Sequence, residues 1–171
     1  MILVESDVSA EWDSSGALEA IAEQAVRAAV AASRYSALIA SDLPVEVSVK
    51  FASDEEVRSL NANWRHKDKA TNVLSFPMVQ AELLGSVAGA ASGEILLGDI
   101  ILAHGVCVRE AEEKGVGVND HAAHLVVHGA LHLLGYDHEQ GEDAAEAMEA
   151  LEREALSALG IADPYAAEAR A

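Results

Sequence analysis

Hydrophobic and polar residues alternate along residues 45–51 (VEVSVKF), and two further apolar runs lie at 73–76 and 94–102. Alternation with a period of two is typical of a strand that has one buried face. Short apolar runs bounded by turn-forming residues are consistent with strands that are buried more completely. The pattern therefore predicts a small β-sheet in the middle of the chain. Residues 80–93, rich in glycine, alanine and serine, are expected to form a surface loop.

Helical spacing of apolar residues accounts for most of the remaining sequence. The predicted helices cover residues 17–40, 54–63, 104–114, 120–134 and 142–159. Ser53 and Glu56 have the spacing of a capping box, Asn119 is expected to cap the fourth helix, and Gly115 and Gly135 would end two helices. These elements predict a single compact α+β domain over residues 1–171, a small mixed β-sheet packed with about five helices.

Composition narrows the class of protein. Four charged residues interrupt the apolar stretch at 17–40, so no membrane span is expected there. Residues 1–16 lack the basic start and apolar run of a signal peptide, and Cys107 is the only cysteine. A lone thiol has no internal disulfide partner and is best interpreted as a small buried hydrophobe. We expect a cytoplasmic protein with no membrane association and no disulfide-linked partner.

The charge is strongly negative, with one local exception. The net charge of −18 should repel nucleic acid and anionic membranes from the molecule as a whole. Yet four of the eleven lysine and arginine residues fall within twelve positions: Arg58, Arg65, Lys67 and Lys69. Taken alone, this segment is more simply a solvated helix end and loop.

Three histidines concentrate the candidate chemistry. His128 and His132 are four residues apart, which places them on one face of the predicted helix, about 5 to 6 Å apart at Cβ. Gly135 lets the backbone turn back, which would bring His138 to the same point. Three imidazole ligands with an open fourth position are typical of a catalytic zinc site. The sequence predicts one Zn²⁺ per chain at the end of this helix, or another divalent metal.

Other polar residues near this motif remain open in role. His124 is interpreted as a residue that supports the metal ligands from behind, faces substrate or is simply exposed, and His121 as a surface residue near the helix start. Asp137 would either orient an imidazole or cap the turn. Asp99 would either hydrogen-bond a metal histidine or end a strand pairing.

The same histidine spacing occurs in metzincin peptidases. In those enzymes the residue after the first histidine is a glutamate that acts as general base. Here that residue is Gly129. Since a positioned proton-transfer group contributes about 10² to 10⁴-fold to catalysis, its absence disfavours peptide hydrolysis.

Three blocks of the sequence resemble the YbeY endoribonucleases, also called rRNA maturation factors. They are LNANWR at 60–65 followed by TNVLSFP at 71–77, LGDI at 97–100, and HGALHLLGYDH at 128–138 with the acidic helix after it. The resemblance extends from about residue 45 to 165. Where the family often has Asp and Tyr, this chain has Asn72 and Trp64.

The resemblance implies a zinc-type metal on His128, His132 and His138, and hydrolysis of single-stranded RNA in rRNA processing, small-subunit maturation and ribosome quality control. It implicates Arg65 and His128 in activity. The small ribosomal subunit and its assembly factors would be partners. An arginine fork suits the charge that gathers on a phosphodiester, so we expect Arg65 to bind phosphate or stabilise the transition state, with Lys67 and Lys69 as weaker contacts to the RNA backbone.

Two alternatives to an endoribonuclease stay open from the residues: a zinc peptidase-like hydrolase, and a ribosome assembly factor whose zinc is mainly structural. The acidic surface and few aromatic stacking platforms favour the latter mildly, because free RNA would be held poorly without a ribosomal partner. The sequence leaves open the nucleophile, the general base, the RNA cleavage site and the oligomeric state.

Overall fold

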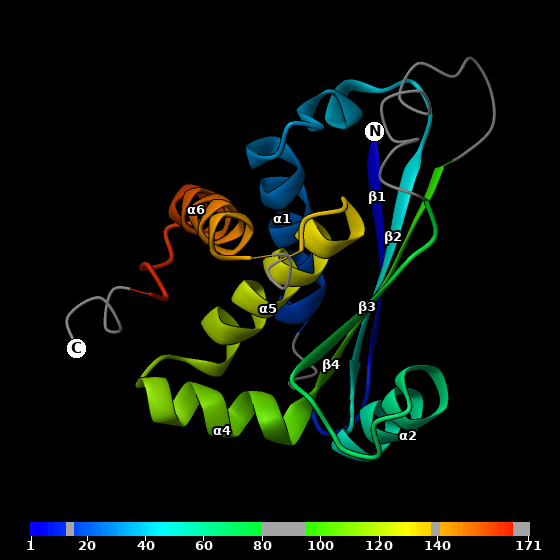
Figure 1. Ribbon diagram of the computed structural model, residues 1–171, viewed down its shortest axis with the longest axis vertical. Helices are drawn as coiled ribbons and strands as arrows, with labels where there is room; N and C mark the ends of the chain where they lie inside the picture. The colour runs from blue at the N-terminus through cyan, green and yellow to red at the C-terminus, as the bar shows by residue number, and fades with distance from the viewer. Residues whose placement is uncertain (13–15, 80–94, 138–140, 166–171) are drawn as a thin grey trace.

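The sheet has four strands, and three of them run parallel. The computed structural model (Figure 1) describes residues 1–12, 16–79, 95–137 and 141–165. The strands are β1 (Ile2–Val8), β2 (Val45–Ala52), β3 (Val73–Pro77) and β4 (Ile95–Ala103), in the order β1-β2-β4-β3. β1, β2 and β4 are parallel, and β3 pairs antiparallel with β4. This mixed sheet confirms the predicted α+β class.

Five α-helices and a short 3₁₀ helix are described around the sheet. They are α1 (Ala17–Ala32), η1 (Ser36–Ala40), α2 (Asp54–Arg65), α4 (His104–Lys114), α5 (Val118–Leu133) and α6 (Glu142–Ala158). Figure 1 shows α1, α5 and α6 gathered on one side of the sheet. Within the described ranges, no helix is long and apolar enough to span a bilayer.

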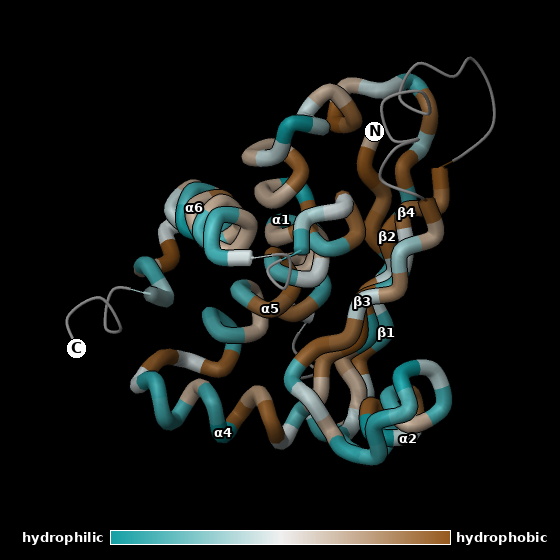
Figure 2. Tube along the Cα trace, in the orientation of Figure 1, coloured by the Kyte–Doolittle hydropathy of each residue, from teal (hydrophilic) through white to brown (hydrophobic). Residues whose placement is uncertain are grey.

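The sheet separates two apolar clusters. The larger one joins β1, β2 and β4 to α1, α5 and α6, with Phe51, Ile100 and Leu102 fully buried at its centre. The smaller one lies beneath α2 and includes Val57 and Ile101. Figure 2 shows the hydrophobic colouring concentrated along the strands. Because side chains alternate along a strand, neighbouring residues of β4 face different clusters.

Helix α5 is the most deeply embedded helix. Its buried residues are His121, Ala122, Ala123, His124, Leu125, Val126, Val127, Gly129, Ala130, Leu131 and Leu133. It is apolar almost all round, which is typical of a helix enclosed by other elements. The few polar side chains on it are therefore held in fixed surroundings.

Several sequence predictions differ from the structure at element ends. The strand β1 was not predicted, although its register with β2 runs from Ile2 opposite Val45 onward. The predicted helix 17–40 is interrupted after α1, where Ser33 is extended and its hydroxyl donates to the carbonyl of Val30 (2.7 Å). Helix α5 begins after Gly117, so the prediction of Asn119 as its cap is wrong. The predicted loop 80–93 lies outside the described residues.

The capping box is confirmed in one half. The backbone amide of Glu56 donates to the hydroxyl of Ser53 (3.1 Å), as expected for the N-terminus of α2. The carboxylate of Glu56 instead accepts from Nζ of Lys50 on β2 (2.7 Å). This pairing ties the start of α2 to the sheet.

Candidate metal centre

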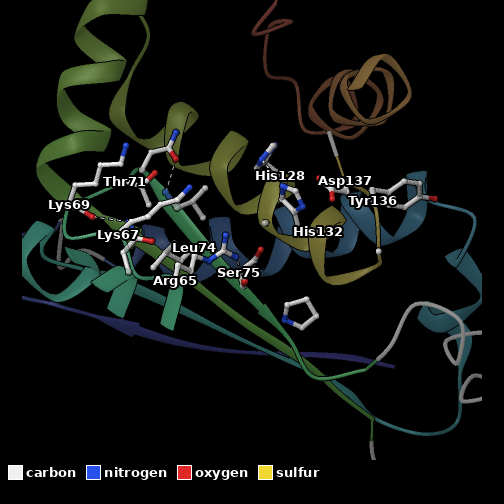
Figure 3. Close-up of a pocket in the computed structure, with 16 residues that line it drawn as sticks. Arg65, Lys67, Lys69, Thr71, Leu74, Ser75, His128, His132, Tyr136 and Asp137 are labelled. Carbon is white, nitrogen blue, oxygen red and sulfur yellow. Dashed lines mark hydrogen bonds between the residues drawn. The ribbon is translucent and has the colours of Figure 1, made fainter. Parts of the chain in front are cut away.

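A pocket of about 700 Å³ opens between the end of α2, strand β3 and the end of α5. Two groups of side chains line it (Figure 3). We call His128 and His132 the histidine wall, and Arg65, Lys67 and Lys69 the basic wall. The two groups are more than fifty residues apart in sequence, and the fold brings them to one cavity.

The two imidazoles of the histidine wall converge. Nε2 of His128 lies 3.1 Å from Nε2 of His132. Two nitrogens bound to one tetrahedral zinc at 2.0–2.1 Å would be about 3.3 Å apart. The pair thus fits a shared metal ion with little movement. His138, the third predicted ligand, lies outside the described residues, although Gly135 has the expected positive φ of 95° just before it.

Glu152 of α6 lies directly behind the histidine wall. It is 1% exposed, and its Oε1 accepts from Nδ1 of His128 (2.8 Å) and Nε2 of His124 (3.2 Å), while the hydroxyl of Tyr165 donates to its Oε2 (2.7 Å). Burial raises the pKa of this carboxyl, but the hydrogen bonds from His124, His128 and Tyr165 outweigh burial and hold the pKa well below its usual range. Glu152 is therefore an ionised acceptor.

The ionised carboxylate selects the tautomer of His128. A carboxylate only accepts hydrogen bonds, so Nδ1 of His128 must carry the hydrogen. In the neutral ring Nε2 then presents a lone pair to the pocket, which is the form that binds metal. Glu152 was not predicted from the sequence. The available signal was its position on the apolar stripe of the predicted helix, between Met148 and Leu156.

The other two histidines of α5 are buried rather than exposed. His124 forms a hydrogen bond with Glu152 and does not line the pocket. Of the roles predicted for it, an indirect one through that carboxylate agrees best with these contacts. The prediction that His121 is a surface residue is wrong: it is 3% exposed, with Nε2 2.9 Å from Oε1 of Glu110. Burial lowers the pKa of His121, although the hydrogen bond to Glu110 opposes this effect.

Asp99 lies on the other face of the sheet from the histidine wall. Its neighbour Ile100 packs against α5 at Gly129, so Asp99 points away from α5 and lines a separate recess with Asp7 and Lys50. The proposed hydrogen bond from Asp99 to His128 or His132 is therefore ruled out. The alternative reading also fails, because pairing of β4 with β3 continues past Asp99 to Gly98. Asp137, by contrast, lines the pocket beside the histidine wall (Figure 3).

Arg65 of the basic wall is held through its side chain, whereas Lys67 and Lys69 are held through their backbone. Nη2 of Arg65 donates to the carbonyl of Ser75 (3.2 Å), and its guanidinium lies 6.0 Å from the ring centroid of Phe76. Buried Asn61 fastens the following loop, since its carbonyl accepts from the amide of Lys67 (3.2 Å) and its Nδ2 donates to the carbonyl of Lys69 (2.9 Å). The three charged side chains remain exposed.

Gly129 has a packing role in this structure. A Cβ at this position would lie 2.8 Å from Cγ2 of Ile100. Only glycine allows α5 to approach β4 this closely without a shift of Ile100. A glutamate of the metzincin kind at this position would have to displace the side chain of Ile100.

Asn72 lies at the pocket edge and explains one departure from the family pattern. Its Oδ1 accepts from the amide of Val73 (2.7 Å), and its Nδ2 donates to Oε1 of Glu110 (3.1 Å). An aspartate cannot make the second bond, and would place two carboxylates together. The side-chain amide of Asn72 is therefore compatible with the neighbouring carboxylate of Glu110.

Two facing imidazoles and three cationic side chains thus line one pocket. The family model described as endoribonuclease YbeY matches residues 7–160 of the chain. This protein belongs to the YbeY family.

Relatives named "Endoribonuclease YbeY" cover almost the whole chain. One from Rhizorhabdus wittichii is 53% identical over 166 residues, which is 97% of this chain and 98% of the relative. One from Sphingopyxis alaskensis is 54% identical over 166 residues, with the same coverage of 97% and 98%. A solution structure of a Thermotoga maritima protein, 20% identical, covers 92% of both chains with a TM-score of 0.54. At that identity the structure supports the fold alone.

Proposed function

We propose that this protein is a metal-dependent endoribonuclease that holds one zinc ion on His128, His132 and His138. The observation that carries the proposal is the 3.1 Å approach of the two Nε2 atoms in a pocket shared with the basic wall. The names of the relatives support an RNA substrate. The resemblance in the three sequence blocks supports single-stranded rRNA as that substrate.

Each wall would serve a different part of the reaction. When bound, zinc would act as a Lewis acid toward the phosphodiester and would lower the pKa of bound water to about 7. Arg65 would place two parallel N–H groups on the non-bridging oxygens, where negative charge gathers. Lys67 and Lys69 would hold neighbouring phosphates and so orient the strand. His128 would be both ligand and part of the reacting centre.

The charge of the molecule favours action on a ribosomal particle. With a net charge of −18, the molecule as a whole should repel free RNA, and the basic wall is a local exception. A small ribosomal subunit or an assembly factor would offset that repulsion by docking the chain on its substrate. We therefore propose that the protein acts in the cytoplasm, in maturation and quality control of the small subunit.

The decisive experiment compares two substrates with and without chelator. Purified protein is given labelled single-stranded RNA and casein, each before and after treatment with chelator. We expect RNA cleavage that chelator abolishes and zinc restores, with casein untouched. Cleavage of casein would favour the peptidase alternative. Loss of folding on metal removal, without RNA cleavage by the loaded protein, would favour an assembly factor with structural zinc.

A further inference from the structure

Three hydrogen-bond donors from separate parts of the fold converge on the carboxylate of Glu152. Two come from His124 and His128 of α5, and the third comes from Tyr165, which follows α6. Because Oε1 and Oε2 both accept, the carboxylate cannot rotate without breaking a bond. The direction of the lone pair that faces His128 is therefore fixed.

The segment that carries Tyr165 is itself fastened to α6. The carboxylate of Asp163 accepts from the amide of Tyr165 (2.8 Å) and lies 3.2 Å from the guanidinium of Arg153. The ring of Tyr165 stands edge-on to His124, with centroids 5.7 Å apart. These contacts hold the hydroxyl of Tyr165 in position to donate to Glu152.

A buried carboxylate is a costly way to fill this space. Transfer of an ionised group out of water is offset only by well-formed hydrogen bonds, and an apolar side chain would pack α6 against α5 more cheaply. Simple packing therefore does not account for Glu152. Its bond to His128 gives the carboxylate a use that a leucine could not supply.

We propose that Glu152 is a positioning residue for the metal site, and that Tyr165 clamps it. Glu152 holds the His128 ring in the Nδ1–H tautomer and aims Nε2 at the point where Nε2 of His132 also converges. The C-terminal turn thereby contributes to metal affinity from outside the pocket, since Tyr165 does not line it. The inference rests on the proposed metal function.

Zinc affinity tests this role without any assay of RNA cleavage. The metal-free full chain competes for zinc with a chromophoric chelator, as wild type, Glu152→Gln, Tyr165→Phe and Glu154→Gln. Glu154 is exposed on the same helix and serves as the matched control. We expect a loss of about 10-fold or more in Glu152→Gln and a smaller loss in Tyr165→Phe, because outer partners of ligating histidines contribute about 10 to 100-fold.

The outcomes separate this inference from the proposed function. Wild-type zinc binding with equal affinity in Glu152→Gln and Glu154→Gln would overturn the positioning role alone. A wild-type chain that binds no zinc would overturn the role of Glu152 and the proposed metal site together.

A second measurement reports the tautomer directly. In metal-free protein, long-range ¹H–¹⁵N spectra reveal which ring nitrogen of His128 carries the hydrogen. We expect Nδ1–H in wild type and Glu154→Gln, and loss of that preference in Glu152→Leu. The same Nδ1–H tautomer in Glu152→Leu would contradict the inference. If this variant does not fold, the affinities of Glu152→Gln and Tyr165→Phe decide.

Discussion

The two walls of the pocket are built in different ways. The histidine wall stands at the end of an almost fully buried helix, with a 1% exposed carboxylate fixing one ring from behind. The basic wall consists of exposed side chains on a helix end and a loop that Asn61 secures through its backbone. A metal needs ligands placed within a fraction of an ångström, whereas phosphates tolerate long charged chains that adjust. The buried helix α5 thus holds its side chains in fixed positions, whereas the end of α2 and the following loop carry side chains that can adjust.

The largest expected effect comes from breaking the histidine wall. His132→Ala removes one of the converging nitrogens, so zinc affinity should fall by more than about 100-fold, beyond the effect of an outer partner. Metal analysis of protein purified without added metal checks this. His66→Ala is the control, because His66 is exposed and does not line the pocket. Equal zinc in His132→Ala and His66→Ala would reject the ligand assignment.

Breaking the basic wall should leave zinc in place. We expect Arg65→Ala to keep its metal and to lose about 10² to 10³-fold in RNA cleavage, the usual loss when a donor to developing charge is removed. Arg65→Lys should recover only part of the rate, because lysine lacks the planar fork. Single-turnover cleavage is measured beside Arg58→Ala, an exposed arginine of the same helix that pairs with Asp68. Loss of both zinc and cleavage in Arg65→Ala would show that the two walls do not act independently.

The sequence predicts most of what is local in these walls. The spacing of His128 and His132 sets their shared face, and the positive φ of Gly135 follows from its place after an apolar helix. The capping hydroxyl of Ser53 likewise acts within three residues. Such features depend on neighbours along the chain, which a sequence displays directly.

Contacts between distant elements are what the sequence left undetermined. Glu152 meets His128 across 24 positions, and only the packing of α6 on α5 creates that bond. Asp99 was misplaced for a similar reason, because the pattern of a strand buried on both faces does not reveal which side faces α5. The missed strand β1 depends on pairing with β2 more than forty positions away.

A smaller effect tests the close approach beneath the histidine wall. Gly129→Ala places a methyl group 2.8 Å from Cγ2 of Ile100. Overpacking costs about 1 to 3 kcal/mol, and the better helix propensity of alanine returns about 1 kcal/mol, so we expect a net loss of about 1 kcal/mol in the free energy of unfolding. Urea unfolding measures it against Gly117→Ala, where nothing lies within 4 Å. In an Ile100→Ala background, Gly129→Ala should no longer lower the free energy of unfolding. An unchanged loss would show that the contact with Ile100 is not its cause.

Acid should lower the free energy of unfolding through His121, which is buried on α5. Burial lowers the pKa of His121 in the folded chain, so the unfolded chain takes up a proton first as the pH falls below about 6.5. Proton uptake by the unfolded state reduces the free energy of unfolding, by at most about 1.4 kcal/mol per pH unit for one group. Urea unfolding of metal-free protein at pH 7.5 and 5.5 measures the loss. His121→Gln keeps a donor for Glu110 and should lose less; an identical loss would exclude His121 as a contributor.

The mildest change concerns the reach of the basic wall along RNA. If Lys67 and Lys69 each contact one phosphate, the double change Lys67→Ala/Lys69→Ala should lower the slope of log affinity against log salt by about 1.4, at about 0.7 per contact on a single strand. Affinity should fall several-fold at low salt and little at high salt, while zinc content stays constant. Labelled RNA binding over a salt series is compared with Lys114→Ala, at the far end of α4. An unchanged slope would show that Lys67 and Lys69 do not contact phosphates, and Arg65 would then be the one residue of the basic wall that binds RNA.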